Sequence, residues 1–440
     1  MVMVRIVSAD ELLVPEGSHV LHIGPHKTGT TSLQSALFNS RDALAEQGVR
    51  FVGYNRHPIS AILAITGRRS PFTDSGRPPG MDRWDEVLGA MRSAEEPRTV
   101  LSSEFFADAD DEGIQRVVDA VGADRIQVVV TLRPLAKIIP SQWQQFIQSG
   151  RIDPLDEWLH RVFEDPGAEP TFWRRHRHDR LIERWAAVVG PERVRVVVVD
   201  DSDHSSILRS FESLLGLTPG TLVVDRSKSN RSLTLGEVEA VRLFNTAFWN
   251  ARLGMALHTK VMRSGAAHFL QERRPEKDER KILLPQWALD AAEPVSRAII
   301  DGVRATDVLL AGDLELLTAQ PHSREEVGET EPVTADPVVA ARLAMGVLLG
   351  TDAATGADPA AAVTTVAPGE DPRAAALEAA RQELRREAQA RAAAAEEAQR
   401  ERAAQAAAYA RIPRPRRFAA RALRAAARRA RGLARRFDGR

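Results

Sequence analysis

Short apolar runs alternate with helical patterns from about residue 20 to residue 317. This alternation is typical of βα units and predicts a mostly parallel sheet flanked by helices. The runs are rich in valine and isoleucine, and their near-continuous apolar content fits strands that are buried on both faces. The predicted strands cover residues 19–24, 49–53, 99–104, 125–132 and 193–200.

Helical periodicity lies between and after these runs. Trp143 and Phe146 lie three residues apart within one such pattern, so we expect both side chains to pack in the core. Residues 1–317 are therefore interpreted as one α/β domain with a P-loop-like parallel sheet. The predicted helices cover residues 32–47, the 140s, 179–189, 207–215, 235–253 and 282–300.

The pattern changes after residue 317. Residues 318–372 are rich in Thr, Pro, Gly, Ala and Asp, and we interpret them as a low-complexity linker with at most one short helix, at 338–350. Residues 373–411 are mostly Ala, Glu, Arg and Gln, which predicts a helix with little to bury. Leu377 and Leu384 are one heptad apart, but the following heptad positions are polar or small and give a coiled coil little support.

Charge is distributed unevenly. Lys+Arg and Asp+Glu both number 60, yet residues 411–440 hold twelve arginines and a single aspartate. The basic segment 412–440 also repeats apolar residues at helical spacing, which predicts peripheral contact with an anionic membrane surface or another polyanion. A disordered solubilising tail is the alternative. Nucleic acid is not an expected partner, because aromatic side chains do not interleave with the basic ones.

Composition restricts the chemistry and the compartment. The chain contains no cysteine, which excludes disulfides, thiolate nucleophiles and cysteine-based metal sites. The N-terminal segment lacks the basic-then-apolar order of a secretory signal, and no apolar run approaches the roughly 18 residues of a spanning helix. We therefore expect a cytoplasmic protein whose basic tail can contact the inner face of the membrane.

The clearest chemical signal is the segment HIGPHKTGTTS, residues 22–32. A predicted strand ends at Gly24, a turn contains Lys27 and Gly29, and hydroxyl residues open a helix. Such a turn directs backbone N–H groups and the positive end of a helix toward one point, where an oxyanion can bind. The glycines let the backbone approach the anion, and Lys27 adds a mobile charge. A plain turn followed by a capped helix is the structural alternative.

The spacing of this loop differs from that of a triphosphate P-loop. Gly24 and Gly29 have the P-loop separation, but Thr30 stands where the P-loop lysine belongs, and Lys27 lies two residues before Gly29. A nucleotide-triphosphate kinase or NTPase is therefore the alternative enzyme. In that case Asp200 or Asp201, after the strand 193–200, would hold Mg²⁺.

The loop resembles the 5′-phosphosulfate loop of sulfotransferases that use 3′-phosphoadenosine 5′-phosphosulfate (PAPS). A second element of that family is an arginine at the end of a later strand, followed eight residues on by a serine, and Arg133 and Ser141 match it. The resemblance covers roughly residues 18–310 and is to a bacterial branch of the family. Two departures are visible: His26 stands where the family often has proline, and Pro134 follows Arg133 directly.

The resemblance implies transfer of a sulfo group from PAPS to a hydroxyl or amine of a carbohydrate, glycolipid or secondary-metabolite acceptor, without an obligatory metal. A basic loop at 226–232 could close over the nucleotide through Arg231; an ordinary solvated turn is the alternative. A non-catalytic nucleotide-binding protein, tethered to a membrane or polyanion, is a third hypothesis. The donor-binding residues so expected are Lys27, Thr28, Gly29, Thr30, Thr31, Ser32, Arg133, Ser141 and Arg231.

Sulfo transfer needs a cation at the leaving phosphate and a base at the acceptor. Lys27 is the predicted cation. The base is either Glu104, at the end of the strand 99–104, or His57, which follows another strand end; the sequence does not choose between them. Arg133 could instead form a salt bridge and Ser141 cap a helix. The cluster Trp173–His178 is expected to be an acceptor-facing or helix-surface patch, not a metal site.

Overall fold

The computed structural model describes residues 4–6, 9–53, 55, 57–73, 75–203, 205–223, 231–328 and 336–352. All of them fall in one compact unit, Met1–Pro359. The second unit, Ala360–Arg440, lies outside the described residues, and so do the predicted helix 373–411 and the basic segment 412–440.

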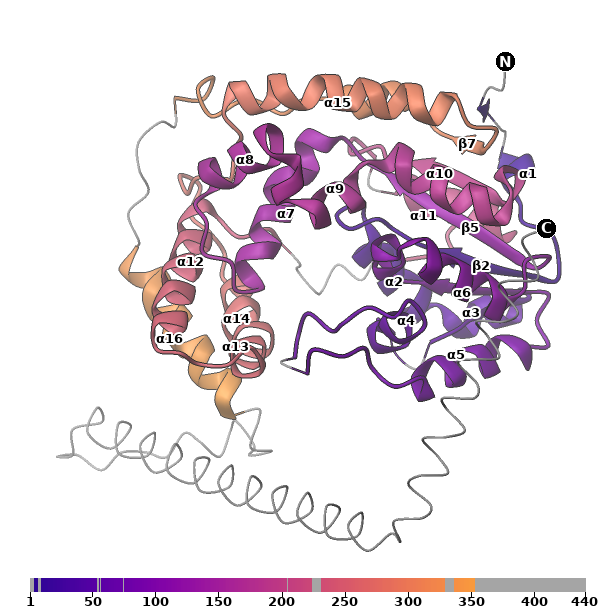
Figure 1. The fold of residues 1–440 in the computed structure, drawn as a ribbon, viewed down its shortest axis with the longest axis horizontal. Coiled ribbons are helices and arrows are strands. Elements are labelled where there is room, and N and C mark those ends of the chain that lie inside the picture. The colour runs from indigo at the N-terminus through magenta and orange to yellow at the C-terminus, as the bar shows by residue number, and fades with distance from the viewer. Residues whose placement is uncertain are drawn as a thin grey trace, which may run out of the picture. The chain divides into compact units, whose positions relative to one another are not determined.

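Seven strands of the described residues form one parallel sheet in the order β1-β7-β6-β5-β2-β4-β3 (Figure 1). The predicted strands are β2–β6, so the predicted parallel α/β fold is confirmed. The two further strands, β1 and β7, have only two and three residues, too few to show a hydrophobic pattern. The bounds are β1 (Arg5–Ile6), β2 (Ser18–His22), β3 (Val49–Phe51), β4 (Arg98–Ser102), β5 (Ile126–Leu132), β6 (Val194–Val198) and β7 (Leu309–Ala311).

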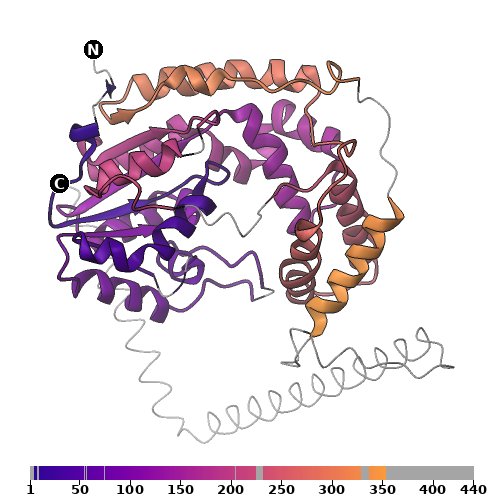
Figure 2. The ribbon, with the colours of Figure 1, turned by 180° about the vertical axis from the view of Figure 1, so that it is seen from behind.

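Successive residues of a strand point to opposite faces of the sheet, and in the central strands both sets are apolar. Helices therefore cover both faces. Val20 of β2 packs in one core with α2 (Thr30–Asn39), α3 (Arg41–Glu46) and α11 (Ser206–Leu215), near the short helix α1 (Ala9–Leu12). Its neighbour Leu21 packs in the core on the other face. That core includes α4 (Ile59–Ile65), α5 (Asp82–Arg92), α6 (Asp111–Val121) and α10 (His178–Val189), and Figure 2 shows the arrangement from behind.

A third core lies in a helical lobe beside the sheet (Figure 1). Trp143 is 1% exposed and packs there with the partly buried Phe146, as predicted. α15 (Gln286–Arg304) joins the lobe to the sheet, since its Leu289 belongs to the lobe core and its Ile299 to a sheet core. The other lobe helices are α7 (Leu135–Gln148), α8 (Leu155–Glu164), α9 (Pro170–His176), α12 (Leu235–Asn250), α13 (Met255–Val261), α14 (Ala267–Glu272) and α16 (Pro337–Asp352).

Shorter turns connect these elements: the 3₁₀ helices η1 (Glu104–Asp108), η2 (Pro166–Ala168), η3 (Pro191–Arg193) and η5 (Leu314–Thr318), and the π-helical turn η4 (Met262–Ala266). The predicted helix 32–47 is two helices, α2 and α3, which meet at Ser40. α16 lies inside the segment interpreted as a linker, yet its Val339 and Leu343 are buried in the lobe core. The compact unit therefore extends beyond the predicted boundary at residue 317.

No helix among the described residues combines the length and the apolar character that crossing a bilayer requires.

Candidate active site

A pocket of about 360 Å³ lies between the carboxyl ends of three neighbouring strands and the helical lobe. The loop after β2, Glu104 after β4 and Arg133 after β5 form one side. In the sheet order, β2 lies between β4 and β5, so the connections from β2 go to opposite sides of it. Ligands of open parallel sheets bind at such a point, where the direction of the strand order reverses. The opposite side consists of Ser141, Gln144, Gln145 and Gln148 of α7, with Arg231, Ser232 and Gln271.

The loop after β2 follows an unusual backbone path. Gly24 has φ 81°, and a Cβ there would lie 2.9 Å from Cα of Glu104, so only glycine lets the two strand ends approach this closely. Lys27 has φ 68°, a left-handed conformation that is strained for a residue with a side chain. Gly29, with φ 84°, is the N-cap of α2 and provides no side-chain hydrogen bond to the helix. The first amides of α2 thus have no capping side chain to compete with an anion.

A buried hydrogen-bond network supports this loop from below. The hydroxyl of Thr28 donates to the carbonyl of Pro25 (2.7 Å) and lies 2.6 Å from the hydroxyl of Thr131 on β5. Thr131 also donates to the carbonyl of Gly24 (3.1 Å), and Nε2 of His22 is 3.2 Å from the Thr131 hydroxyl. The Thr28 side chain therefore braces the loop and does not line the pocket. Thr30 is also largely buried but lines the pocket, whereas Thr31 and Ser32 line it and are exposed.

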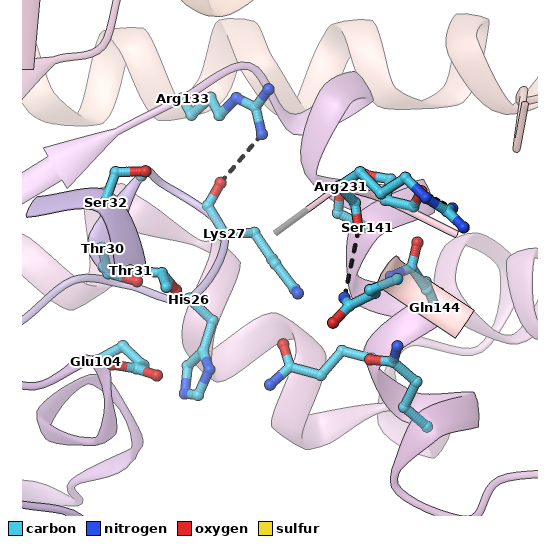
Figure 3. Close-up of a pocket in the computed structure, with 15 residues that line it drawn as sticks. His26, Lys27, Thr30, Thr31, Ser32, Glu104, Arg133, Ser141, Gln144 and Arg231 are labelled. Carbon is cyan, nitrogen blue, oxygen red and sulfur yellow. Dashed lines mark hydrogen bonds between the residues drawn. The ribbon is translucent and has the colours of Figure 1, made fainter. Parts of the chain in front are cut away.

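Lys27 is half-buried, and its side chain points from the loop toward the side that carries Ser141 and Gln144 (Figure 3). Burial lowers the pKa of Lys27 to about 8, against the opposing charge of Glu104 and with smaller contributions from Arg175 and Arg133. Near neutral pH the group is mostly an ammonium, but a weakly solvated one. Such a cation interacts strongly with any anion that enters the pocket.

Glu104 lines the same pocket and accepts a hydrogen bond from Nε2 of Gln34 (2.9 Å). Burial acts to raise the pKa of Glu104, but the electrostatic effect of His26, the Gln34 hydrogen bond and the effect of His57 outweigh it and lower the pKa. The group is therefore a carboxylate near neutral pH. His57 does not line the pocket; its backbone N–H donates to Oδ1 of Asn55 (2.9 Å), and it is close enough to Glu104 for its charge to matter.

His26 is a pocket residue that the sequence interpretation noted only as a departure from the family pattern. It is 2% exposed, packs edge-on against Phe105 with 5.2 Å between ring centroids, and places Nε2 3.7 Å from Oδ2 of Asp108. Arg175 donates two hydrogen bonds to Asp108, of 2.6 and 2.7 Å. Burial and the charge of Arg175 lower the pKa of His26, so the ring is neutral near pH 7.

The expectation that the cluster Trp173–His178 forms an acceptor-facing or helix-surface patch is wrong for its histidines. His176 and His178 are 0% and 1% exposed. They lie where α9 meets α10, and Nε2 of His176 is 3.2 Å from Oε1 of Gln142. Their sequence neighbours Arg174 and Arg175 suggested a surface, but the fold turns the rings inward. No group of three or more metal-ligating side chains occurs among the residues that the structure describes.

Arg133 follows β5 and lines the pocket, and its side chain is 27% exposed. Its Nε donates to Oδ1 of Asp201 (3.0 Å) and an Nη donates to the carbonyl of Lys27 (3.4 Å) (Figure 3). Nζ of Lys137 lies 3.0 Å from the other oxygen of Asp201. Arg133, Lys137 and Ser141 are spaced four residues apart, so helical periodicity could have identified Lys137, which the sequence interpretation missed.

Arg231 lines the pocket, but its guanidinium is already saturated. It donates to both carboxylate oxygens of Glu237 (2.7 Å each) and to the carbonyls of Arg273 (2.8 Å), Ser232 (2.9 Å) and Leu270 (2.5 Å). A guanidinium has five N–H donors, and these five bonds use all of them. In contrast to the expected phosphate contact, Arg231 here holds the start of α12 to the end of α14. Residues 224–230 of the same loop lie outside the described residues.

No protein-family model matches the chain, and no curated protein matches it. Among solved structures it is similar to the crystal structure of a sulfotransferase from Alicyclobacillus acidocaldarius. The two chains share 17% identity, the match covers 54% of this chain and 94% of the other, and the TM-score is 0.35. A likeness of this size assigns neither a family nor an activity.

Proposed function

We propose that this chain is a PAPS-dependent sulfotransferase that transfers a sulfo group to a hydroxyl or amine of a carbohydrate, glycolipid or secondary-metabolite acceptor. One observation carries the proposal: the Lys27 ammonium and the uncapped start of α2 share a pocket with Arg133 and Ser141. The two sequence elements on which the resemblance rests, far apart in the chain, line the same pocket. A phosphosulfate needs anion donors at one end and a phosphate contact at the other.

Lys27 is the group proposed to stabilise the leaving phosphate. During transfer the acceptor oxygen forms a bond to sulfur, the bond from sulfur to the bridging oxygen breaks, and its electron pair remains on the phosphate. The ammonium and the first amides of α2 can interact with the charge that develops there. Because Lys27 is poorly solvated, little water has to be displaced before this interaction forms.

The proton released by the acceptor needs a base. Glu104 is the better placed of the two expected groups, because it lines the pocket as a carboxylate while His57 does not line it. We therefore propose Glu104 as the base and His57 as a group that lowers its pKa. Arg133 and Ser141 are proposed to bind the 3′-phosphate of the donor, with Lys137 assisting. When the donor binds, Asp201 either keeps its ion pairs with Arg133 and Lys137 or releases them and is hydrated by water instead.

The alternative enzyme, a nucleotide-triphosphate kinase or NTPase, is less well supported by the geometry. Its predicted Mg²⁺ ligand Asp201 has its oxygens directed at Arg133 and Lys137. The other candidate, Asp200, accepts two hydrogen bonds from Ser202, of 2.8 and 2.6 Å. Thr30 also remains at the position of the P-loop lysine.

Calorimetric titration distinguishes the two enzymes. We expect adenosine 3′,5′-bisphosphate to bind without a divalent ion and MgATP not to compete with it; binding of MgATP alone would contradict the proposal. A single-turnover assay with ³⁵S-labelled PAPS and a mixed acceptor pool then separates an enzyme from the third hypothesis. A binding protein tethered to a membrane or polyanion would retain the donor without releasing labelled product.

A further inference from the structure

We propose that the acceptor is an uncharged, hydroxyl-rich molecule, a neutral sugar or similar polyol, which is recognised by an amide wall. The amide wall consists of Gln145, Gln148 and Gln271, which line the pocket opposite the loop after β2. The inference rests on the proposed sulfotransferase function and extends it to the class of acceptor.

The first argument is position. Ser141, Gln145 and Gln148 follow one another at intervals of four and three residues, so they lie on one face of α7. With a rise of about 1.5 Å per residue, Gln148 lies about 10 Å further along the helix axis than Ser141. If Ser141 contacts the 3′-phosphate of the donor, Gln148 lies well beyond that phosphate. The end of α7 therefore lines a part of the pocket that is available to a second molecule.

The second argument is hydrogen bonding. Nε2 of Gln148 is buried and has no hydrogen-bond partner. A buried amide without a hydrogen-bond partner is unfavourable. A ligand oxygen that accepts from this amide therefore contributes more binding free energy than one that accepts from an amide with a partner in the protein. The neighbouring Gln144 shows the contrast, because its Oε1 accepts from the backbone N–H of Leu233 (3.1 Å). Gln271 donates to the carbonyl of Arg231 (3.3 Å), which leaves its oxygen available to a donor.

The third argument is charge. Among the described residues that line this side of the pocket, the one cation is Arg231, whose donors are all used by Glu237 and backbone carbonyls. An anionic sugar would therefore find no free cation beside the amides among these described residues, and a cationic one would face Lys27. None of the described lining residues is Phe, Tyr or Trp, so a phenol would have no aromatic surface to stack on. A carboxamide carries a donor and an acceptor side by side, which suits hydroxyl groups.

The experiment compares four small acceptors under the same conditions with ³⁵S-labelled PAPS. They are methyl β-glucoside, methyl glucuronide, methyl glucosaminide and p-nitrophenol. We expect methyl β-glucoside to have the highest kcat/KM. Preference for p-nitrophenol or for either charged sugar overturns the inference. Transfer to none of the four, with adenosine 3′,5′-bisphosphate still bound, also overturns it but leaves the donor site standing.

Variants test whether Gln148 contributes to acceptor recognition. Gln148→Leu should lower kcat/KM for methyl β-glucoside by about three- to tenfold through KM, as expected for one lost neutral hydrogen bond. The dissociation constant of adenosine 3′,5′-bisphosphate should change less than twofold. Gln115→Leu is the matched control, because Gln115 is exposed on α6, away from the pocket.

Two other results would reject the amide wall. If Gln148→Leu weakens the bisphosphate and leaves the acceptor KM unchanged, these amides hold the donor. If Gln148→Leu behaves like the control in both measurements, the wall contributes nothing to recognition. Absence of bisphosphate binding by the unmodified protein would instead refute the proposed function, and this inference with it.

Discussion

The two sides of the pocket both contain cations, but they use them differently. On the strand-end side, Lys27 makes no ion-pair contact with any described carboxylate, and Arg133 has Nη groups that reach only the carbonyl of Lys27. On the lobe side, Arg231 and Arg273 share the fully buried carboxylate of Glu237, and Arg273 also pairs with Glu279. Among the described residues that line the pocket, positive charge that can still act on a ligand is thus found at the strand ends.

This difference separates cations that can bind a ligand from cations that stabilise the fold. A cation that already makes all its hydrogen bonds lowers the energy of the folded chain but has little left for a ligand. A cation held on a strained loop without an ion-pair contact is unfavourable for folding and available for chemistry. The backbone of Lys27 and its lowered pKa are both signs of the second situation.

Glu237→Ala tests the supporting role of the lobe side and should have the greatest effect. The change leaves Arg231 and Arg273 without their shared carboxylate, and it also removes the side chain that accepts from the backbone N–H of Thr234 (2.8 Å) at the start of α12. We expect the free energy of unfolding to fall by about 3–5 kcal/mol. Urea denaturation followed by circular dichroism measures it.

The control for this prediction is Glu239→Ala, two residues further along the same helix. Glu239 pairs with Arg242 at a partly exposed position and should contribute about 1 kcal/mol or less. Equal losses for the two variants would show that the Glu237 cluster has no special structural role, and the contrast between the two sides would disappear.

Lys27→Ala tests the other side. The protein should stay folded, with kcat for sulfo transfer reduced about 10²–10³-fold, as is typical when one group that stabilises developing negative charge is removed. Single-turnover kinetics with saturating labelled donor measure the effect. Lys260→Ala on α13 is the matched control. An unchanged kcat in Lys27→Ala would exclude the ammonium from the chemistry.

Arg133→Ala and Arg231→Ala form a direct comparison between two arginines that line the same pocket. A charge-assisted hydrogen bond to phosphate is worth about 1.5–3 kcal/mol, so loss of Arg133 should weaken adenosine 3′,5′-bisphosphate by about 10–150-fold. Loss of Arg231 should instead reduce the thermal midpoint and leave the affinity of the folded protein nearly unchanged. Calorimetry on both variants would show a reversed pattern if Arg231 were the phosphate ligand.

The pH dependence provides a smaller and more specific test. The pKa of Lys27 in the free protein is lowered to about 8, so kcat/KM should be constant from neutral pH up to about 8 and fall about tenfold per pH unit above it. The same shift means that Lys27 binds its proton more tightly in the unfolded chain than in the folded one. Between pH 8 and the ordinary pKa of a lysine, the contribution of Lys27 to the free energy of unfolding therefore rises with pH.

Lys27→Arg should remove the decline of kcat/KM above pH 8, because a guanidinium stays protonated. A decline that persists unchanged in this variant would have to come from another group.

Much of the fold is readable from local pattern. The strands β2, β4, β5 and β6 are largely buried on both faces, so their apolar runs are nearly continuous, whereas the edge strand β3 exposes Arg50. The ranges predicted for β2–β6 overlap all five strands. The loop after β2 is equally visible, because Gly24, Lys27 and Gly29 lie within six residues and their backbone requirements are local. α4, α5 and α6 lie outside the predicted helices, although each buries an apolar face whose spacing is visible in the sequence.

What local pattern cannot provide is the identity of a partner far away in the chain. Arg231 in a basic loop suggests a phosphate ligand, and only the return of α14 brings the carbonyls of Leu270 and Arg273 against it. His176 and His178 stand among arginines, yet the packing of α9 and α10 buries them. Hydrophobic period and turn chemistry depend on neighbours within a few residues, so the chain specified its strands and its anion loop directly. Which charges stay free also depends on contacts between residues far apart in the chain, such as those of Arg231 with Leu270 and Arg273, and only the folded arrangement settles it.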